Sequence, residues 1–471
     1  MVFSSFTFLS VFLPLVLLVY YLAPRRFRNP ILLVASLVFY AWGDYRYLWV
    51  LLAGVMVSYV AALILERTAA SPPWQRKLLL AFFVGADLAP LLWYKYSNFF
   101  VSNIAEAFHL DYTMCTIVMP LGISFYTFQS LSYIVDVYRG TCRAQRRLLD
   151  LTLYISFFPQ LVAGPIVKYH DVAGAIDCRR ESLSQFAYGL RRFMLGFAKK
   201  ILFANVFGQI ADSVYGTPVE QLGVSFSWVG ALAYMLQIYF DFSAYSDMAI
   251  GLGAMFGFSF LENFDYPYRS LSITEFWRRW HISLSTWFKE YLYIPLGGNR
   301  VPHLRNLANL WIVFFLTGLW HGAEWTFVVW GLYHGAFIIM EKATGWHKRT
   351  NGPLLKAVHS VYLLLVVLIG WVFFRADNLS HALHYIATMF GLLETTPIHD
   401  LGFYLSYDLI IPLLLALPAA FGAWHNLVCI PSCPRSLAVQ IVIDMAILLC
   451  FAFAIAFLAG TSYNPFIYFR F

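Results

Sequence analysis

Three histidines of this chain stand next to tryptophan or glycine residues within the window 277–335. They are His281, His321 and His334. A neutral imidazole can accept a proton from an attacking hydroxyl and return it to a leaving group, which is what acyl transfer from a thioester to an alcohol requires. The residue types in this window therefore favour acid–base chemistry at a histidine.

The composition around this window indicates a membrane protein. Hydrophobic residues make up 60% of the 471 positions, aromatic residues 19% and charged residues 12%. Such a chain is too apolar for a soluble domain and long enough for many membrane spans. Polar side chains at membrane depth are costly and usually functional. We expect an all-α polytopic integral membrane protein, with residues 277–335 as its active site.

The net charge of +7 indicates membrane topology rather than nucleic-acid binding. Basic residues form short groups between apolar runs, at 25–28, 67–77 and 139–147, as cytoplasmic loops do. The first apolar run, 6–22, has no basic residue before it and a basic group after it. We expect this run to be retained, with its N-terminus outside.

The apolar runs predict membrane helices, because a segment in lipid must satisfy its own backbone hydrogen bonds. Several runs are shorter than the roughly 20 residues that a full crossing needs, so we expect roughly 10 to 14 segments that include half-spans and re-entrant pieces. Pro159 and Pro165 favour a broken element within residues 151–167. The expected segments are 6–22, 30–42, 47–65, 78–94, 116–133, 151–167, 201–214, 224–240, 310–320, 325–340, 358–374, 412–423 and 437–458.

No long linker divides the chain. We expect a single membrane domain over residues 1–471, with a core of about residues 1–380, an interfacial helix near 272–291 and additional C-terminal membrane helices over 381–471. The six cysteines contain no CxxC pair and are attributed mostly to packing. Cys429 and Cys433 are close enough in sequence to pair in a loop.

The interfacial helix is predicted from a capping box. Ser272 and Glu275 have the required spacing, which starts a helix at Ser272 and carries it through His281 toward Tyr291. Its aromatic residues fall three or four apart, so we expect it to lie at the cytoplasmic interface with its tryptophans in the headgroup region. Anchoring to the membrane explains Arg278, but an anchor does not need His281.

His321 is expected to lie deep in the protein. Arg305 precedes it by 16 residues and Lys342 follows it by 21. At about 1.5 Å per residue, His321 lies about 24 Å and about 30 Å along a helix from these two basic flanks. With both flanks cytoplasmic, the segments form a hairpin with its tip at residues 320–322. The competing interpretation is a structural histidine hydrogen-bonded within a helix bundle.

The sequence also allows classes of function other than catalysis. His321 and His334 are 13 residues apart, roughly 220° on a straight helix, so they cannot share a metal or haem unless the segment breaks between them. Acidic residues in apolar runs can mark ion paths, which makes a secondary transporter one alternative. A non-catalytic scaffold of a polysaccharide export complex is another. The acidic residues are Asp87, Asp241, Asp247, Asp408 and Asp444, and each could equally cap a helix or pair with a base.

Several stretches resemble one enzyme family. Within the window they are 277–284 (WRRWHISL), 291–300 (YLYIPLGGNR), 318–323 (GLWHGA), 330–331 (WG) and 334–335 (HG), and outside it 1–5 (MVFSS), 120–126 (PLGISFY), 163–165 (AGP) and 239–247 (YFDFSAYSD). These stretches are similar to the membrane-bound O-acyltransferase family. Within that family they resemble the branch of the alginate O-acetyltransferase membrane subunit, and more distantly the teichoic-acid D-alanyl transfer protein.

The resemblance implies a fold and a set of site residues. The fold is a ring of tilted, broken and re-entrant helices around a central tunnel. By position, His321 is the catalytic histidine deep in the tunnel, and His281 is the second catalytic histidine on its cytoplasmic side. Arg278 and Arg279 could meet phosphates of the donor. The candidates for the acyl-donor site or the tunnel wall are Trp277, Arg278, Trp280, Trp320, Asp241 and His334.

The resemblance also implies substrates, partners and location. An acetyl group would pass from a cytoplasmic thioester, acetyl-CoA or another acyl thioester, to the periplasmic side, for O-acetylation of an exported polysaccharide of the alginate or cellulose type. No bound cofactor, metal or nucleic acid is expected. The expected partners are a periplasmic acetyltransferase, a polysaccharide synthase and export complex, and the lipid bilayer. The expected location is the bacterial inner (cytoplasmic) membrane, with multiple passes.

Overall fold

The computed structural model describes residues 2–111, 117–162, 164–348, 351–398, 402, 407–423 and 436–467. Every regular element within these ranges is a helix, which confirms the all-α prediction. The chain forms two compact units, Met1–Gly189 with Ala249–Leu261, and Leu190–Met248 with Glu262–Phe471. The single membrane domain stays a prediction, and Cys115, Cys429 and Cys433 lie outside the described residues.

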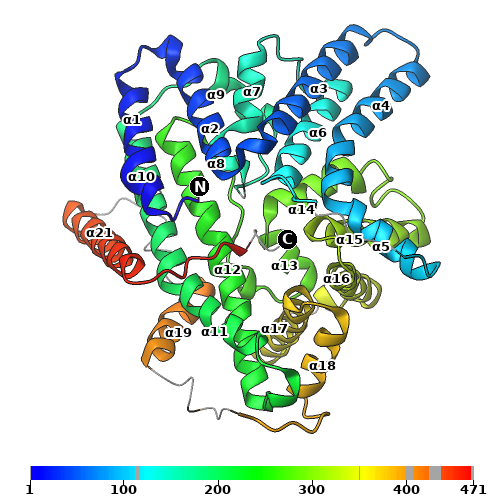
Figure 1. Ribbon diagram of the computed structural model, residues 1–471, viewed down its shortest axis with the longest axis vertical. Helices are drawn as coiled ribbons and strands as arrows, with labels where there is room; N and C mark the ends of the chain where they lie inside the picture. Colours follow the sequence, from blue (N-terminus) through cyan, green and yellow to red (C-terminus); the bar gives the residue numbers. More distant parts are fainter. Residues whose placement is uncertain are drawn as a thin grey trace. The chain divides into compact units, whose positions relative to one another are not determined.

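The first unit is a bundle of helices in which α3, α4 and α6 pack on one another (Figure 1). The predicted break within residues 151–167 is confirmed, because α7 ends at Ser156 and a new short helix begins at Phe158 with Pro159 in its first turn. Proline suits that position because its missing N–H has no partner there. The helices are α1 (Leu13–Leu22), α2 (Arg28–Asp44), α3 (Leu48–Arg67), α4 (Pro73–Leu91), α5 (Ser97–Ala107), α6 (Ile123–Arg139), α7 (Leu148–Ser156), α8 (Phe158–Leu161) and α9 (Tyr169–Asp177).

The second unit contains the histidine window. Two helices, α10 (Leu183–Lys199) and α12 (Val224–Met255), belong partly to each unit. The others are α11 (Asn205–Tyr215), α13 (Ile273–Arg279), α14 (Ile282–Phe288), α15 (His303–His321), α16 (Trp325–Thr344), α17 (Pro353–Arg375), α18 (Leu379–Met389), α19 (Tyr407–Ala420) and α21 (Leu437–Ala459). Short 3-10 or π turns lie at Phe8–Phe12, Arg25–Phe27, Tyr45–Tyr47, Leu92–Tyr96, Lys200–Ala204, Val219–Gln221, Pro267–Arg269, Lys289–Tyr293 and Trp346–Lys348.

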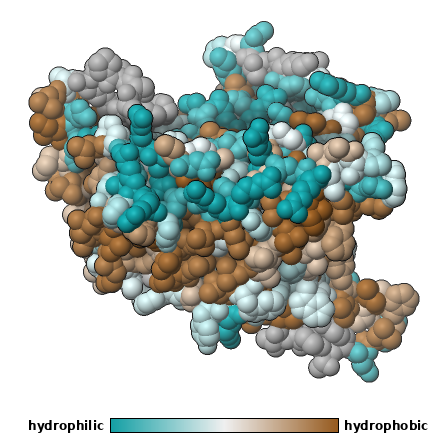
Figure 2. All heavy atoms as spheres, turned by 90° about the horizontal axis from the view of Figure 1, so that it is seen from above, coloured by the Kyte–Doolittle hydropathy of each residue, from teal (hydrophilic) through white to brown (hydrophobic). Residues whose placement is uncertain are grey.

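Helices with the properties of membrane spans occur in both units. Among the described residues, five helical stretches are long and apolar enough to cross a membrane: Arg25–Arg67, Pro73–Ala107, Leu183–Tyr215, Pro353–Arg375 and Leu437–Ala459. Large apolar side chains cover much of the face seen in Figure 2. Solvent-exposed positions of this kind include Leu18, Leu22, Phe82, Leu414, Val442 and Phe453. A lipid environment explains this exposure, and the protein is a multi-pass membrane protein.

Helix α12 is longer than predicted. The predicted segment ends at Phe240, but the helix continues to Met255. The acidic residues of the added turns are paired: Asp247 forms ion pairs with Arg192 at 2.7 Å and with Lys199 at 2.5 Å. A paired carboxylate can stay in a buried helix without the full cost of an isolated charge.

The ion pair of Lys200 with Asp241 fixes the C-terminal segment to α12. The two side chains are 3% and 1% exposed, and Lys200 Nζ lies 2.8 Å from Asp241 Oδ1. The backbone N–H of Ile467 donates to Asp241 Oδ2 at 2.9 Å. The ring of Phe466 stacks on Tyr245, one helical turn after Asp241, with ring centroids 4.4 Å apart. Asp241 therefore holds three segments of the second unit together.

We predict that Lys200→Met strongly destabilises the protein. Removing one partner of a buried ion pair leaves an uncompensated charge and typically costs about 3–5 kcal/mol. Thermal unfolding in detergent measures this loss. Lys356→Met, at an exposed lysine of α17, is the matched control and should change stability by no more than about 0.5 kcal/mol. Equal unfolding temperatures for the two variants would contradict the prediction.

Candidate active site

The backbone turns sharply at His281. Helix α13 ends at Arg279, and α14 begins at Ile282. His281 itself adopts a left-handed conformation, φ 44° and ψ 55°. The prediction of one continuous helix from Ser272 to Tyr291 is therefore wrong, although its capping box is confirmed, since Ser272 Oγ accepts from the Glu275 N–H at 3.0 Å. A left-handed conformation is unfavourable for a residue with a β-carbon, so surrounding contacts must hold it.

Asn263 supplies those contacts. Its backbone carbonyl accepts from the Ile282 N–H at 2.9 Å. Its side-chain Oδ1 accepts from the Ser283 N–H at 3.1 Å and lies 3.3 Å from His281 Nδ1. These bonds hold His281 itself and the two residues that follow it. The sequence reasoning missed Asn263, because it lies outside the histidine window and its spacing carries no signal of contact with His281.

His281 is enclosed by aromatic rings. Its side chain lies on Phe242 at a centroid distance of 4.7 Å and near Trp320 at 6.1 Å, both at steep angles. The residue is 1% exposed and lies outside the five candidate spans. Burial lowers the pKa of His281 to about 3, because the charged ring would lose its hydration. The imidazole is therefore neutral at physiological pH.

His321 lies at the tip of the predicted hairpin, which is confirmed. It is the last residue of α15, and α16 begins four residues later at Trp325. Glycines let the two helices approach closely: a β-carbon on Gly318 would come within 2.4 Å of the Phe327 carbonyl oxygen, and one on Gly331 within 2.3 Å of that of Phe314. These glycines therefore serve helix packing.

The indole of Trp320 contacts both histidines. Its centroid lies 4.9 Å from the His321 ring and 6.1 Å from the His281 ring. His321 is 7% exposed, and the rings of Trp330 and Phe374 also enclose it, at 5.0 and 5.1 Å. The structure thus brings together His281, from the turn before α14, and Trp320 and His321, from the end of α15.

Trp277 and Trp280 pack inside the second unit, so the prediction that they lie in the lipid headgroup region is wrong. Trp277 meets Trp330 of α16 at 5.5 Å, and Trp280 meets Trp371 of α17 at 4.9 Å. Both side chains are buried. The physical reason is the break at His281, which ends α13 and directs its tryptophans onto α16 and α17. Trp287 of α14 is also buried.

His334 lies behind these tryptophans. It is completely buried on α16, with Trp277 at 5.2 Å and Trp330 at 5.3 Å. The segment does break between His321 and His334, and the Trp330 indole contacts both imidazoles. Among the described residues, no group of three or more His, Cys, Asp or Glu side chains could hold a metal ion.

The charged candidates have different surroundings. Arg278 is exposed on α13. Arg279 is held by Asp265 at 2.6 Å and Glu275 at 2.9 Å, so a role in donor binding would compete with these pairs. Asp241 forms the ion pair described above, one residue before the Phe242 ring that contacts His281. This pairing supports the structural interpretation of Asp241 over an ion path.

Glu341 holds the start of α13 and was missed by the sequence reasoning. The side chain is completely buried. Its Oε1 accepts from the Ile273 N–H at 2.6 Å, and its Oε2 accepts from the Thr274 N–H at 2.9 Å and the Thr274 hydroxyl at 2.7 Å. A carboxylate is favourable at these otherwise unsatisfied backbone donors. The available signal was an acidic residue directly after the apolar run 325–340.

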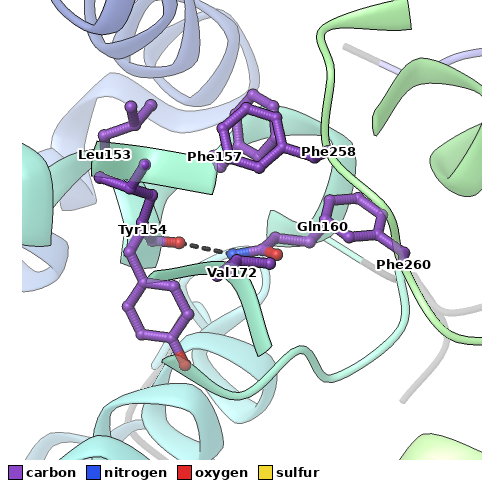
Figure 3. Close-up of a pocket in the computed structure, with 8 residues that line it drawn as sticks. Leu153, Tyr154, Phe157, Gln160, Val172, Phe258 and Phe260 are labelled. Atoms are coloured by element: carbon purple, nitrogen blue, oxygen red, sulfur yellow. Dashed lines mark hydrogen bonds between the residues drawn. The ribbon is translucent and has the colours of Figure 1, made fainter. Parts of the chain in front are cut away.

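A separate small cavity lies in the first unit (Figure 3). Its wall is apolar except for Gln160, whose Nε2 donates to the Tyr154 carbonyl at 2.5 Å, and the Tyr154 phenol. The lining residues are Leu153, Tyr154, Phe157, Gln160, Val172, Ile176, Phe258 and Phe260. None of the predicted site residues lines it, so it does not contribute to the histidine site.

We predict that Gly370→Ala destabilises the tryptophan layer. A β-carbon at Gly370 would lie 2.5 Å from His334 Nε2, and the packed indoles leave that ring little room to move. Overpacking of this kind typically costs about 1–3 kcal/mol. Thermal unfolding should show the loss. Gly85→Ala is the control, since no atom lies within 4 Å of its added β-carbon, and an equally large loss there would refute the steric explanation.

Comparison with known proteins identifies the family of this chain. Residues 144–380 match the membrane-bound O-acyltransferase family. The chain is 42% identical to a probable alginate O-acetylase from Pseudomonas putida, over all of both chains. It is 35% identical to a peptidoglycan O-acetyltransferase from Helicobacter pylori, over 83% of this chain and 80% of that one. A teichoic acid D-alanyltransferase from Bacillus subtilis is 30% identical over 46% of this chain and 58% of its own. The chain therefore belongs to the membrane-bound O-acyltransferase family and is an O-acyltransferase.

Proposed function

We propose that this enzyme transfers an acetyl group from a thioester to a hydroxyl, with His321 as the catalytic proton-transfer group and His281 as the second histidine of the site. The observation that carries the proposal is the contact of one indole, Trp320, with both buried imidazoles. Two buried histidines around one aromatic ring suit proton transfer in a place that excludes water. The full-length similarity to a probable alginate O-acetylase supports acetyl as the group transferred.

The reaction moves one proton through His321. The imidazole accepts the proton of the attacking hydroxyl, whose oxygen forms a bond to the thioester carbonyl carbon. The carbon–sulfur bond then breaks, and the departing thiolate takes the proton back from the imidazolium, which leaves an ester and a free thiol. The rings of Trp320, Trp330 and Phe374 limit water around His321, which suppresses hydrolysis of the thioester.

The donor is proposed to be acetyl-CoA or another acyl thioester that enters from the cytoplasm. A passage through the ring of helices would lead it past His281 to His321. Arg278 is the better placed of the two arginines to meet donor phosphates, because it is exposed while Arg279 is held by Asp265 and Glu275. Trp277, Trp280 and His334 would support the wall of this passage.

The acceptor side is proposed to be periplasmic, in the bacterial inner membrane. The final product would be an O-acetylated exported polysaccharide of the alginate or cellulose type, made with a periplasmic acetyltransferase partner and a polysaccharide synthase and export complex. The names of two relatives, an alginate O-acetylase and a peptidoglycan O-acetyltransferase, support a cell-envelope glycan as the acceptor class.

We predict that His321→Ala lowers the rate of acetyl transfer by about 10²- to 10⁴-fold, the usual contribution of a positioned general base. The assay uses purified protein in detergent with an acetyl thioester and an alcohol acceptor. His384→Ala, at an exposed histidine of α18, is the matched control and should keep the parental rate. Thermal unfolding of both variants excludes a folding defect. Parental rates in folded His321→Ala would remove His321 from the reaction.

We predict that Arg278→Gln raises KM for acetyl-CoA about 10- to 100-fold, with little change in kcat. A charge-assisted hydrogen bond to phosphate contributes about 1.5–3 kcal/mol, and it binds ground state and transition state alike. Acetyl-pantetheine, which lacks the nucleotide phosphates, should show the same KM with the parent and with the variant. An equal increase in KM for both donors would show that Arg278 acts through something other than phosphate.

A further inference from the structure

The orientation of the Asn263 side-chain amide is fixed by its neighbours. The Ser283 N–H lies 3.1 Å from one amide atom, and a backbone N–H can only donate, so that atom is the oxygen Oδ1. On the other side, Nδ2 donates to the Ser246 hydroxyl at 3.0 Å. Asn263 is completely buried, so these partners hold it in one orientation.

This orientation determines which nitrogen of His281 carries the proton. Oδ1 has no hydrogen to give, so His281 Nδ1, 3.3 Å away, must be the donor. The hydrogen bonds of the Ser283 hydroxyl are consistent with this assignment. It donates its own hydrogen to Oδ1 at 2.9 Å and therefore presents a lone pair to His281 Nδ1 at 3.4 Å. A neutral imidazole with the proton on Nδ1 has its lone pair on Nε2.

Helix α12 supports both the amide and the imidazole. Phe242 and Ser246 are four residues apart, so they lie on the same face of the helix. Phe242 packs on the His281 ring at 4.7 Å, and Ser246 accepts from Asn263. His281 Nε2 is buried and has no hydrogen-bond partner within the described part of the chain. The ring thus has one nitrogen held by the protein and one without a partner among the described residues.

We propose that Asn263 is a positioning residue that presents His281 Nε2 as a hydrogen-bond acceptor for the hydroxyl of the acceptor substrate. A lone pair on Nε2 can receive an O–H hydrogen bond, but it cannot stabilise the negative oxygen that develops on the thioester carbonyl. His281 therefore orients the nucleophile while His321 takes its proton. This assignment rests on the proposed acetyl transfer and specifies which substrate His281 recognises.

Asn263→Asp tests the assignment through the pH profile. A carboxylate beside Nδ1–H stabilises the imidazolium and raises the pKa of His281. Protonated Nε2 cannot accept a hydrogen bond, so the acidic limb of kcat/KM against pH should move to higher pH by one unit or more. Asn309→Asp, at a buried asparagine whose side chain bonds Leu296 O, is the control and should leave the limb in place. A structural role alone would lower the rate without moving the limb.

Two milder variants cover the case in which Asn263→Asp does not fold. Asn263→Ala removes the acceptor that keeps the proton of His281 on Nδ1. It should lower kcat/KM for the alcohol about 10- to 100-fold, with the KM of the thioester donor unchanged. Ser246→Ala removes only the Nδ2 partner and should cause a smaller loss of the same kind. Parental kinetics for the alcohol in every folded variant would overturn the proposal.

The outcomes separate this proposal from the proposed function. Full activity of His321→Ala would overturn acetyl transfer at this site, whatever Asn263 does. Loss of activity in His321→Ala together with an unmoved acidic limb in folded Asn263→Asp would overturn the positioning role alone. A thioester KM that rises in Asn263→Ala while the alcohol KM stays constant would assign His281 to the donor instead.

Discussion

A residue with a β-carbon is strained in the left-handed region, and His281 occupies that region at the point where α13 turns into α14. Asn263 holds this turn through its backbone carbonyl and its side chain. Without the turn, an ordinary helix would continue along one axis, and its aromatic residues would follow a single stripe. With it, the tryptophans of α13 face α16 and α17, while His281 reaches Trp320 and, through that indole, the surroundings of His321.

Buried carboxylates also hold separate segments together elsewhere in the second unit. Glu341 accepts from the first backbone N–H groups of α13, and Asp241 accepts from the N–H of Ile467 while it pairs with Lys200. Each carboxylate thus joins segments far apart in the sequence. A buried charge is tolerated only with such partners. Loss of the Asp241 carboxylate would leave Lys200 and the Ile467 N–H unsatisfied, and loss of the Glu341 carboxylate would leave the first N–H groups of α13 unsatisfied. Glu341 and Asp241 are therefore attachment points between segments, which explains these two buried carboxylates without ion transport.

The parts of the site that sequence reasoning predicted are those determined locally. The α15–α16 hairpin with His321 at its tip follows from segment lengths and basic flanks, and Pro159 lies in the first turn of the helix that begins at Phe158 after the break. The turn at His281 could not be predicted in this way. It depends on Asn263, 18 residues earlier, and α13 depends on Glu341, 68 residues after Ile273. Aromatic residues three or four apart fit a continuous amphipathic helix equally well, so tertiary hydrogen bonds decided between the two structures.

The aromatic enclosure of His321 also constrains how a proton can be used there. An imidazolium in apolar surroundings loses most of its hydration, and a ring face returns only about 0.5–2 kcal/mol through a cation–π contact. The positive charge of the imidazolium is stabilised when a negative oxygen or thiolate forms beside it in the same step, since opposite charges attract strongly where water is excluded. A histidine enclosed by Trp320, Trp330 and Phe374 is therefore suited to being protonated transiently within one turnover, but not to staying protonated between turnovers. The proposed acyl transfer makes that demand, because in it the proton taken from the nucleophile would be returned to the leaving thiolate.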